Sequence, residues 1–288
     1  MLRFFKMNGI GNSFIFFDEN IQDYSCIRKP ERIRAICDPG TGIGADGVVF
    51  VMPPGDIDKN NCKMEIYNSD GSRAEMCGNA LRCVAHLYLS QRGDREKVSI
   101  ETDCGDKTVT LAEKTDAVVL YKAQIGKASF DLVSKGELIP DFSGNFAFDG
   151  KDYAVEYVNV GNPHAVIFLK KMPCEQKIKK IGKAIENHNN DPKKINVEFV
   201  EITSRNSCNA QIWERGCGIT KACGTGACAI VAAGIKNGLF DNKVKVSMPG
   251  GSLTIEQDKG KNLYMTGPVQ EVVYGHLSGV FVSALRKI

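Results

Sequence analysis

The sequence lacks features that mark several common classes of protein. Its 37 Lys and Arg residues against 34 Asp and Glu residues give a net charge of +3, with no basic block to neutralise a run of phosphates. No stretch approaches the roughly 18 apolar residues that a membrane helix needs. The opening residues 1–17 are interrupted by Lys6, Asn8 and Gly9, so they contain no signal-peptide hydrophobic region. We therefore expect a soluble, cytoplasmic protein that binds neither nucleic acid nor membrane.

Motifs of other enzyme classes are also missing. The glycine-rich residues 40–47 lack the Lys-Ser/Thr ending of a phosphate-binding loop and the spacing of a dinucleotide fingerprint, so a structural turn is the expected interpretation. Zinc sites favour Cys pairs about two to four residues apart. Cys83 and Cys228 follow other cysteines by six and five positions, and we expect them to pack in the interior. The sequence predicts no metal site and no cofactor.

What the sequence does contain is a long-range repeat. Residues 66–72 correspond to residues 212–218 at an offset of 146 positions, and Cys77 corresponds to Cys223 at the same offset (223 − 77). Residues 98–110 correspond to residues 244–256 in the same register. Because separate features share one spacing, the sequence predicts a duplication.

Each copy has the pattern of a strand, a turn, a helix that begins at Cys-Gly, and a β-hairpin. We expect an α+β fold with two pseudo-symmetric domains, each a mostly antiparallel sheet wrapped around a central helix. The expected N-terminal domain is residues 1–117 plus 268–288 and carries Cys77, and the C-terminal domain is residues 118–267 and carries Cys223. The lysine-rich residues 170–194 are expected to form one or two solvated helices.

The two repeated cysteines are candidates for proton transfer. A thiol at a helix N-terminus meets unpaired N–H groups and the positive end of the helix dipole, which favour the thiolate and lower its pKa. If the two halves face one another across a cleft, Cys77 and Cys223 approach one ligand from opposite sides. One then removes a Cα proton while the other delivers a proton to the opposite face, which inverts the carbon centre without a cofactor.

Neighbouring residues suit the binding of an amino acid. The backbone N–H groups of the Gly78-Asn79 and Gly224-Thr225 pairs are placed to meet the negative charge that develops on the substrate carboxylate. Glu214 and Arg215, with Asn68 as their counterpart in the first copy, are candidates to bind the substrate's ammonium and other polar groups.

The two motifs resemble the signatures of diaminopimelate epimerase. The first is Asn68-Ser69-Asp70-Gly71-Ser72 followed by Cys77-Gly78-Asn79-Ala80-Leu81-Arg82, and the second runs from Glu214-Arg215-Gly216 to Cys223-Gly224-Thr225-Gly226-Ala227. The resemblance covers nearly the whole chain, including Gly161-Asn162-Pro163-His164, Asn196-Val197 and Gly267-Pro268 with Tyr274.

This resemblance implies a diaminopimelate epimerase-like fold and a pyridoxal-independent isomerase that interconverts LL- and meso-2,6-diaminoheptanedioate in lysine biosynthesis. It implies that Cys77 and Cys223 are the acid/base pair, that His164 and Glu214 support catalysis, and that Tyr274 lies at a homodimer interface. The substrate contacts that it implies are Asn12, Asn68, Gly78, Asn79, Asn162, Asn196, Glu214, Arg215, Gly224 and Thr225.

Three other functions remain open at this point. A racemase of another amino acid would share the fold and both cysteines. A thiol redox protein would cycle Cys77 and Cys223 through a disulfide, whereas an epimerase exchanges the Cα proton without net oxidation. A non-catalytic amino-acid-binding module would bind its ligand and leave its stereochemistry unchanged.

Overall fold

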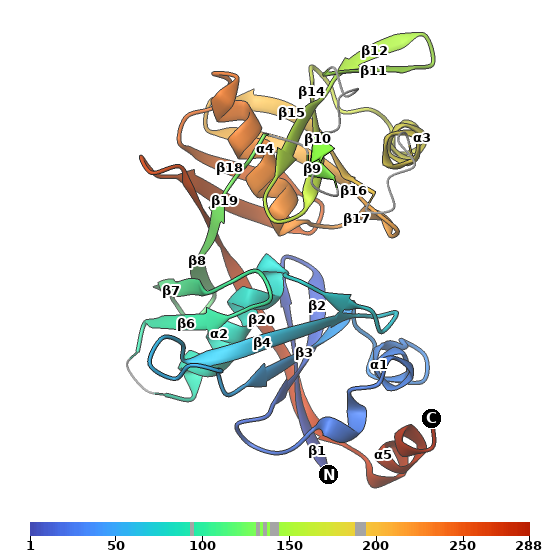
Figure 1. Ribbon diagram of the computed structural model, residues 1–288, viewed down its shortest axis with the longest axis vertical. Helices are drawn as coiled ribbons and strands as arrows, with labels where there is room; N and C mark the ends of the chain where they lie inside the picture. The colour runs from blue at the N-terminus through green and yellow to red at the C-terminus, as the bar shows by residue number, and fades with distance from the viewer. Residues whose placement is uncertain (93–94, 131–132, 135–136, 139–143, 188–193) are drawn as a thin grey trace. The chain divides into compact units, whose positions relative to one another are not determined.

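The computed structural model describes residues 1–92, 95–130, 133–134, 137–138, 144–187 and 194–288 (Figure 1). Its helices are η1 (Ser25–Ile27), α1 (Pro30–Cys37), α2 (Gly78–Ser90), α3 (Glu175–Glu186), α4 (Gly224–Lys236) and α5 (Gly279–Arg286). The strands up to the middle of the chain are β1 (Leu2–Gly9), β2 (Asn12–Asp18), β3 (Gly47–Met52), β4 (Cys62–Asn68), β5 (Arg73–Ala74), β6 (Lys97–Glu101), β7 (Lys107–Lys114), β8 (Val119–Lys127), β9 (Val133–Ser134) and β10 (Glu137–Leu138). The later strands are β11 (Asn145–Phe148), β12 (Lys151–Ala154), β13 (Glu156–Asn159), β14 (Pro163–Leu169), β15 (Asn196–Ser204), β16 (Ser207–Glu214), β17 (Gly218–Thr220), β18 (Lys243–Met248), β19 (Gly251–Gln257) and β20 (Asn262–Leu277).

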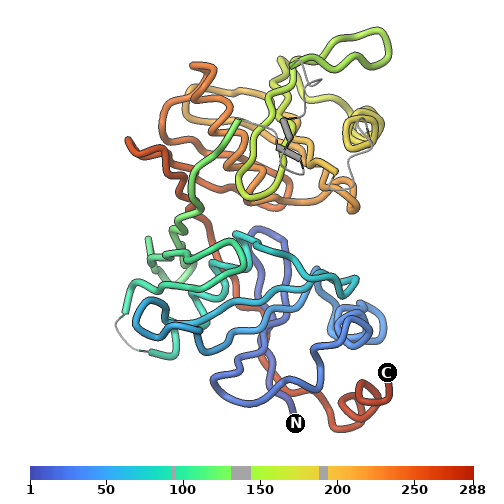
Figure 2. The backbone as a smooth tube through the Cα atoms, viewed as in Figure 1, coloured from blue at the N-terminus to red at the C-terminus, as the bar shows by residue number. Residues whose placement is uncertain are grey.

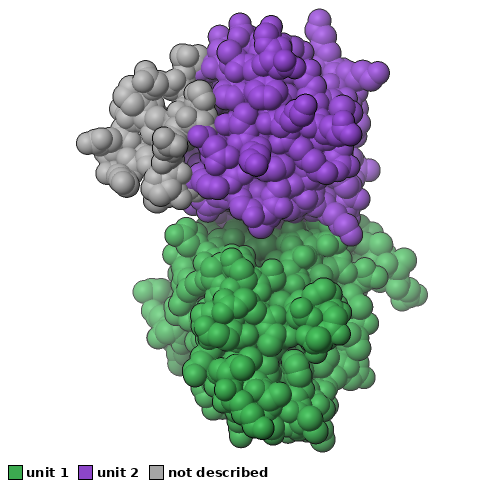
Figure 3. All heavy atoms as spheres, turned by 90° about the vertical axis from the view of Figure 1, so that its right-hand side faces the viewer, with its two compact units in different colours: residues 1–123, 267–288 green, residues 124–266 purple. Residues whose placement is uncertain are grey.

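These elements divide into two compact units, coloured separately in Figure 3. Unit 1 comprises residues 1–123 and 267–288, and unit 2 comprises residues 124–266. None of the helices in the described parts of the chain is long and apolar enough to cross a membrane.

Unit 1 is built around helix α2. Its strands follow the order β1-β2-β3-β4-β6-β7-β8-β20, and β20 also pairs with β1, so the ring of strands closes. Helix α2 contacts β1, β2, β4, β6 and β7, and nearly all of its residues are buried. An apolar helix with buried residues on every side needs such an enclosing sheet, since no face of it suits water.

A second core covers the outer face of this ring. Residues 14–18 of β2 and 47–51 of β3 are buried on both faces, so they are apolar at every position except Asp18. Phe17 and Phe50 stack on that outer face, where the buried side chains of α1 and α5 cover them. The opposite face of β2 packs on α2.

Unit 2 is built around helix α4. Its strands follow the order β20-β19-β18-β16-β15-β14-β13, and α4 contacts β13, β14, β15 and β19. Helix α3 packs on β15 and β16 through Ile178, Ile181 and Ile185, while its charged side chains other than the buried Glu186 face water. This agrees with the solvated helix expected within residues 170–194, although residues 188–193 lie outside the described residues.

The two units share strand registers at the offset of 146 residues. Cys62 pairs with Ile100 between the parallel strands β4 and β6, and Cys208 pairs with Val246 between the parallel strands β16 and β18. The turn strands β5 and β17 pair with β4 and β16 in the same matched register. Most other neighbouring strands are antiparallel. The predicted α+β class with mainly antiparallel strands is therefore confirmed.

Two strands run from one unit into the other, and Figure 2 lets the reader follow both. Strand β8 begins in unit 1 and ends in unit 2, with the division after Ala123. Strand β20 begins in unit 2 and ends in unit 1, with the division before Gly267. Each unit thus contains the end of a strand that starts in the other.

Candidate active site

Cys77 lies at the start of the central helix of unit 1. Its backbone is extended, and its carbonyl accepts the first helical hydrogen bond from Leu81 N–H, so it is the N-cap residue of α2. Its Sγ donates to Asn12 Oδ1 at 3.6 Å. The helix start was predicted at this residue, and the structure places it there.

A hydrogen-bonded cluster positions the groups beside Cys77. Asn12 Oδ1 also accepts from Asn79 Nδ2 at 3.3 Å, and Asn12 Nδ2 donates to Asp46 Oδ2 at 3.0 Å. Arg82, which has no exposed surface, donates to Asn79 Oδ1 at 2.9 Å and to the Gly78 carbonyl at 3.2 Å. Each amide in the cluster therefore has its orientation set by a charged neighbour.

Asp46 connects this cluster to the turn that follows Asn68. Its carboxylate holds Asn12 Nδ2 and the Ser13 N–H, while its carbonyl accepts from the Ser69 N–H at 3.0 Å. Asn68 ends β4, and its Nδ2 donates to Ser72 Oγ at 3.0 Å. The glycine-rich residues 40–47 are a structural turn, as expected, but this turn also carries a polar residue of the candidate site.

Cys223 is the N-cap residue of α4 in unit 2. Its Sγ accepts from the Gly226 N–H at 3.3 Å and lies 3.5 Å from Thr225 Oγ1. Burial, with the nearby carboxylates of Glu214 and Glu198, raises the pKa of Cys223 well above its ordinary value, although the bonds from Thr225 and Gly226 lower it. The lowered pKa that we expected from the helix start is thus wrong for Cys223, because burial of the sulfur raises its pKa more than the hydrogen bonds from Thr225 and Gly226 lower it.

His164 and Asn162 continue the polar surroundings of Cys223. Asn162 Nδ2 donates to Thr225 Oγ1 at 3.3 Å, and Asn162 Oδ1 lies 3.0 Å from His164 Nε2. His164 Nδ1 lies 2.6 Å from Glu198 Oε1, and neither side chain has exposed surface. The structure therefore joins three predicted residues, Thr225, Asn162 and His164, in one chain of contacts.

The remaining predicted residues of unit 2 lie at the ends of β15 and β16. Asn196 begins β15, and its Oδ1 accepts from the Arg215 N–H at 3.0 Å. Glu214 ends β16, where its carboxylate accepts from Thr220 Oγ1. Tyr274 belongs neither to the cluster beside Cys77 nor to the residues beside Cys223. It lies on β20 in unit 1, with 64% of its surface exposed.

Three charged residues of the candidate site were not predicted. They are Asp46, Arg82 and Glu198, and each is held in the polar clusters beside a predicted residue. A signal for Glu198 was available, because residues two apart on a strand face the same side and Glu198 follows Asn196 at that spacing. Cys83 and Cys228 are fully buried in α2 and α4, as expected for packing residues.

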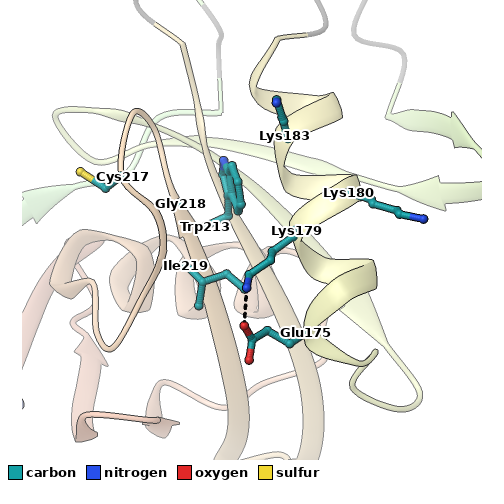
Figure 4. Close-up of a pocket in the computed structure, with 8 residues that line it drawn as sticks. All are labelled: Glu175, Lys179, Lys180, Lys183, Trp213, Cys217, Gly218 and Ile219. Carbon is teal, nitrogen blue, oxygen red and sulfur yellow. Dashed lines mark ion pairs between the residues drawn. The ribbon is translucent and has the colours of Figure 1, made fainter.

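A separate hollow of about 580 Å³ lies between α3 and the β16–β17 turn (Figure 4). The Lys179 ammonium on its rim is ion-paired with Glu175 at 2.6 Å. None of its residues was predicted to act in the site, and they are Glu175, Lys179, Lys180, Lys183, Trp213, Cys217, Gly218 and Ile219.

Comparison with known proteins matches these features to one family. The family model described as diaminopimelate epimerase matches residues 4–130 and 156–272. The chain belongs to the diaminopimelate epimerase family. It is similar to the diaminopimelate epimerases of Methanococcus maripaludis (39% identity over 286 residues, 96% of this chain and 99% of the relative) and Acetivibrio thermocellus (39% over 289 residues, 96% and 98%).

Membership of the diaminopimelate epimerase family makes the protein an isomerase. A solved hydroxyproline epimerase from Agrobacterium vitis matches the fold with a TM-score of 0.68 and 12% identity, covering 96% of this chain and 90% of that one. At this identity the likeness concerns the fold alone. In the described parts of the chain, no group of three or more His, Cys, Asp or Glu side chains is arranged to hold a metal ion.

Proposed function

We propose that this protein is a diaminopimelate epimerase that interconverts LL- and meso-2,6-diaminoheptanedioate in the cytoplasm for lysine biosynthesis, without pyridoxal phosphate or another cofactor. The observation that carries the proposal is the family match over both halves of the chain, with a cysteine at the N-cap of each central helix. The small-molecule substrate follows from the same family.

We further propose that the two halves are pseudo-symmetric domains, 1–117 plus 268–288 and 118–267, that descend from a duplication. Support comes from the strand pairs Cys62–Ile100 and Cys208–Val246, which match at an offset of 146 residues. Register is set by the alternation of buried side chains, so unrelated sheets have no reason to keep it over several strands.

In the proposed mechanism Cys77 and Cys223 act on opposite faces of the substrate Cα. One sulfur, as thiolate, takes the Cα proton, and the other, as thiol, gives a proton to the opposite face. The hydrogen bonds suit such a pair, because the Cys77 thiol donates to Asn12 whereas the Cys223 sulfur accepts from Gly226. The raised pKa of Cys223 also makes its thiolate a stronger base than an ordinary cysteine thiolate.

The substrate groups that gain charge need hydrogen-bond donors. The N–H groups of Gly78, Asn79, Gly224 and Thr225 lie in the first turns of α2 and α4, where helical N–H groups have no partner within the helix. We assign them to the carboxylate as it acquires enolate-like charge. Further substrate contacts are assigned to Asn12, Asn68, Asn162, Asn196, Glu214 and Arg215, with His164 and Glu214 as supporting catalytic residues.

Proton exchange in deuterium oxide tests the proposed function. Incubating the reduced protein with meso-diaminopimelate, with no added pyridoxal phosphate, is expected to remove the Cα proton signal and to produce the LL isomer. Proton NMR follows the signal, and chiral chromatography identifies the product. No exchange with this substrate but exchange with another amino acid would identify a racemase of different specificity. A disulfide cycle with no exchange would indicate a thiol redox protein.

We also propose that the enzyme is a homodimer that uses the surface around Tyr274. Val272, Val273 and Tyr274 of β20 are exposed by 54%, 46% and 64%, a run of apolar side chains that a second copy would cover. Arg3 lies over the rings of Phe5 and Tyr274, which makes this part of the surface continuous with β1.

Tyr274→Glu is expected to convert the dimer to a monomer, because it sets a charge against its own copy in a two-fold interface. Sedimentation velocity measures the change. Val280→Ser is the control, since Val280 is 83% exposed on α5 and lies outside this surface. A wild-type protein that sediments as a monomer, or a Tyr274→Glu variant that remains a dimer, would contradict this interface.

A further inference from the structure

Buried Glu198 is joined to the sulfur of Cys223 by a chain of side-chain contacts within unit 2. Glu198 Oε1 lies 2.6 Å from His164 Nδ1, and His164 Nε2 lies 3.0 Å from Asn162 Oδ1. Asn162 Nδ2 donates to Thr225 Oγ1 at 3.3 Å, and Thr225 Oγ1 lies 3.5 Å from Cys223 Sγ. Four contacts therefore connect a fully buried carboxyl group to a proposed acid/base thiol.

The orientation of the Asn162 amide decides which atoms of this chain of contacts donate and which accept. Its oxygen faces His164, and because an amide oxygen only accepts, His164 Nε2 must carry a hydrogen. Its nitrogen donates to Thr225, so the hydroxyl proton of Thr225 is available for the sulfur of Cys223. The Thr225 hydroxyl and the Gly226 N–H are then both donors to a Cys223 thiolate.

Glu198 is the group that can keep the hydrogen on Nε2. Because the Asn162 oxygen requires a hydrogen on Nε2, two arrangements are possible: the Glu198 carboxylate accepts from Nδ1 of a doubly protonated imidazolium, or the Glu198 carboxylic acid donates to a bare Nδ1. In both cases Nε2 keeps its hydrogen, and the pair has the same number of protons and no net charge. Without Glu198 a neutral imidazole is free to place its only hydrogen on Nδ1. A bare Nε2 accepts a hydrogen bond, so the Asn162 amide would turn its Nδ2 toward His164 and its Oδ1 toward Thr225. The Thr225 hydroxyl would then donate to Asn162 and no longer to Cys223.

The packing at the start of α4 leaves room for the carboxyl group of Glu198. A Cβ on Gly226 would lie 2.8 Å from Glu198 Oε1 and 3.4 Å from Cys223 Sγ, so glycine is needed for the carboxyl group to lie beside the start of α4. Among the described residues Glu198 Oε2 has no hydrogen-bond partner, so the contact with His164 is the one that positions this carboxyl group. A buried carboxyl group that gives stability alone would be expected to have both oxygens bonded.

We propose that Glu198 is a positioning residue of this enzyme: it holds the hydrogen on Nε2 of His164 and thereby keeps Thr225 directed as a donor at the sulfur of Cys223. The proposal rests on the proposed function, in which Cys223 is one of the two acid/base thiols. Glu198 itself touches neither the substrate nor the reacting proton.

Two substitutions separate hydrogen-bond direction from charge. Glu198→Leu removes the partner of Nδ1, and we expect kcat to fall on the order of 100-fold, within the range for loss of acid–base function. Glu198→Gln is expected to stay within about ten-fold of wild type, because its amide N–H still donates to Nδ1 and leaves the hydrogen on Nε2. Glu156→Gln is the control, since it removes a carboxylate of unit 2 that pairs at the surface with Lys236.

The pH dependence of Cys223 alkylation by iodoacetamide gives a readout that a purely structural role would not move. Mass spectrometry with fragment ions distinguishes Cys223 from Cys228 in the peptide of residues 222–236. The charged groups that face Cys223 are Glu214 and Glu198, and both raise its pKa. Both variants remove the Glu198 carboxyl group, which raises the pKa of Cys223, but only Glu198→Leu also loses the Thr225 donor. We therefore expect the midpoint of alkylation to lie at higher pH in Glu198→Leu than in Glu198→Gln.

The difference between the two variants decides the matter. If Glu198→Leu and Glu198→Gln have the same midpoint, Glu198 acts on the thiol through its charge alone and the proposal is overturned. If the midpoint lies at lower pH in Glu198→Leu than in Glu198→Gln, the proposal also fails.

If Glu198→Leu does not fold, proton–nitrogen NMR of the wild-type imidazoles decides the matter. The His164 signals, assigned by their loss in His164→Gln, are expected to show that Nε2 carries a hydrogen, and a bare Nε2 would overturn the proposal. Wild-type deuterium exchange tests the proposed function separately, because the alkylation and NMR readouts do not require turnover.

Discussion

Replacing either Cys77 or Cys223 with alanine is expected to lower the rate of epimerisation by about 10³-fold or more, in both directions of the reaction. Each sulfur is the only proposed proton carrier on its face of the substrate, and positioned acid–base groups contribute roughly 10²- to 10⁴-fold each. Loss of one carrier stops inversion even if the other still exchanges a proton. The measurement is the initial rate with LL- and with meso-diaminopimelate, by chiral chromatography.

Matched controls are available on the same two helices. Cys83→Ala and Cys228→Ala change fully buried cysteines of α2 and α4 by a small volume. Both controls are expected to keep most of the turnover. Near wild-type rates in Cys77→Ala or Cys223→Ala would refute the two-thiol mechanism and leave the family assignment intact.

Arg82→Met is expected to lower the free energy of unfolding by about 2–4 kcal/mol, the range for a buried charged hydrogen-bond partner. The fully buried guanidinium donates to Asn79 Oδ1 and to the Gly78 carbonyl, and methionine leaves both acceptors without these donors. Epimerisation is expected to fall as well, because the Asn79 amide then no longer orients Asn12 beside Cys77. Urea denaturation followed by circular dichroism measures the free energy.

The matched control for this prediction is Arg286→Met, at the exposed end of α5. A surface substitution of this kind should change the free energy of unfolding by less than about 0.5 kcal/mol. Equal effects of the two substitutions would mean that Arg82 contributes only its charge to the protein, and that Asn79 is oriented by other contacts.

The helices that carry the cysteines were predictable because local signals determine them. Extended Cys77 and Cys223 precede mainly apolar segments, and the structure begins α2 and α4 at the following glycines. The matched hairpins after each helix were predictable for the same reason, since alternation of buried and exposed side chains is a property of the strand itself.

Asp46, Arg82 and Glu198 were not predictable in this way. Their positions depend on which strands become neighbours: Glu198 meets His164 only because β14 and β15 pair in parallel, with His164 opposite Asn196. The pKa of Cys223 likewise depends on how deeply the sulfur is buried and on two carboxylates that come from other strands. Local pattern identifies the helix start, but tertiary packing decides the electrostatics there.

The strands β8 and β20 bear on how the chain can be divided. Unit 2 contains the end of β8, unit 1 contains the end of β20, and residues 267–288 return to unit 1 after the whole of unit 2. Each unit therefore completes its strands only with a segment that is continuous with the other unit. By the same logic, a chain divided at the turn between β7 and β8 makes two fragments that need one another to fold.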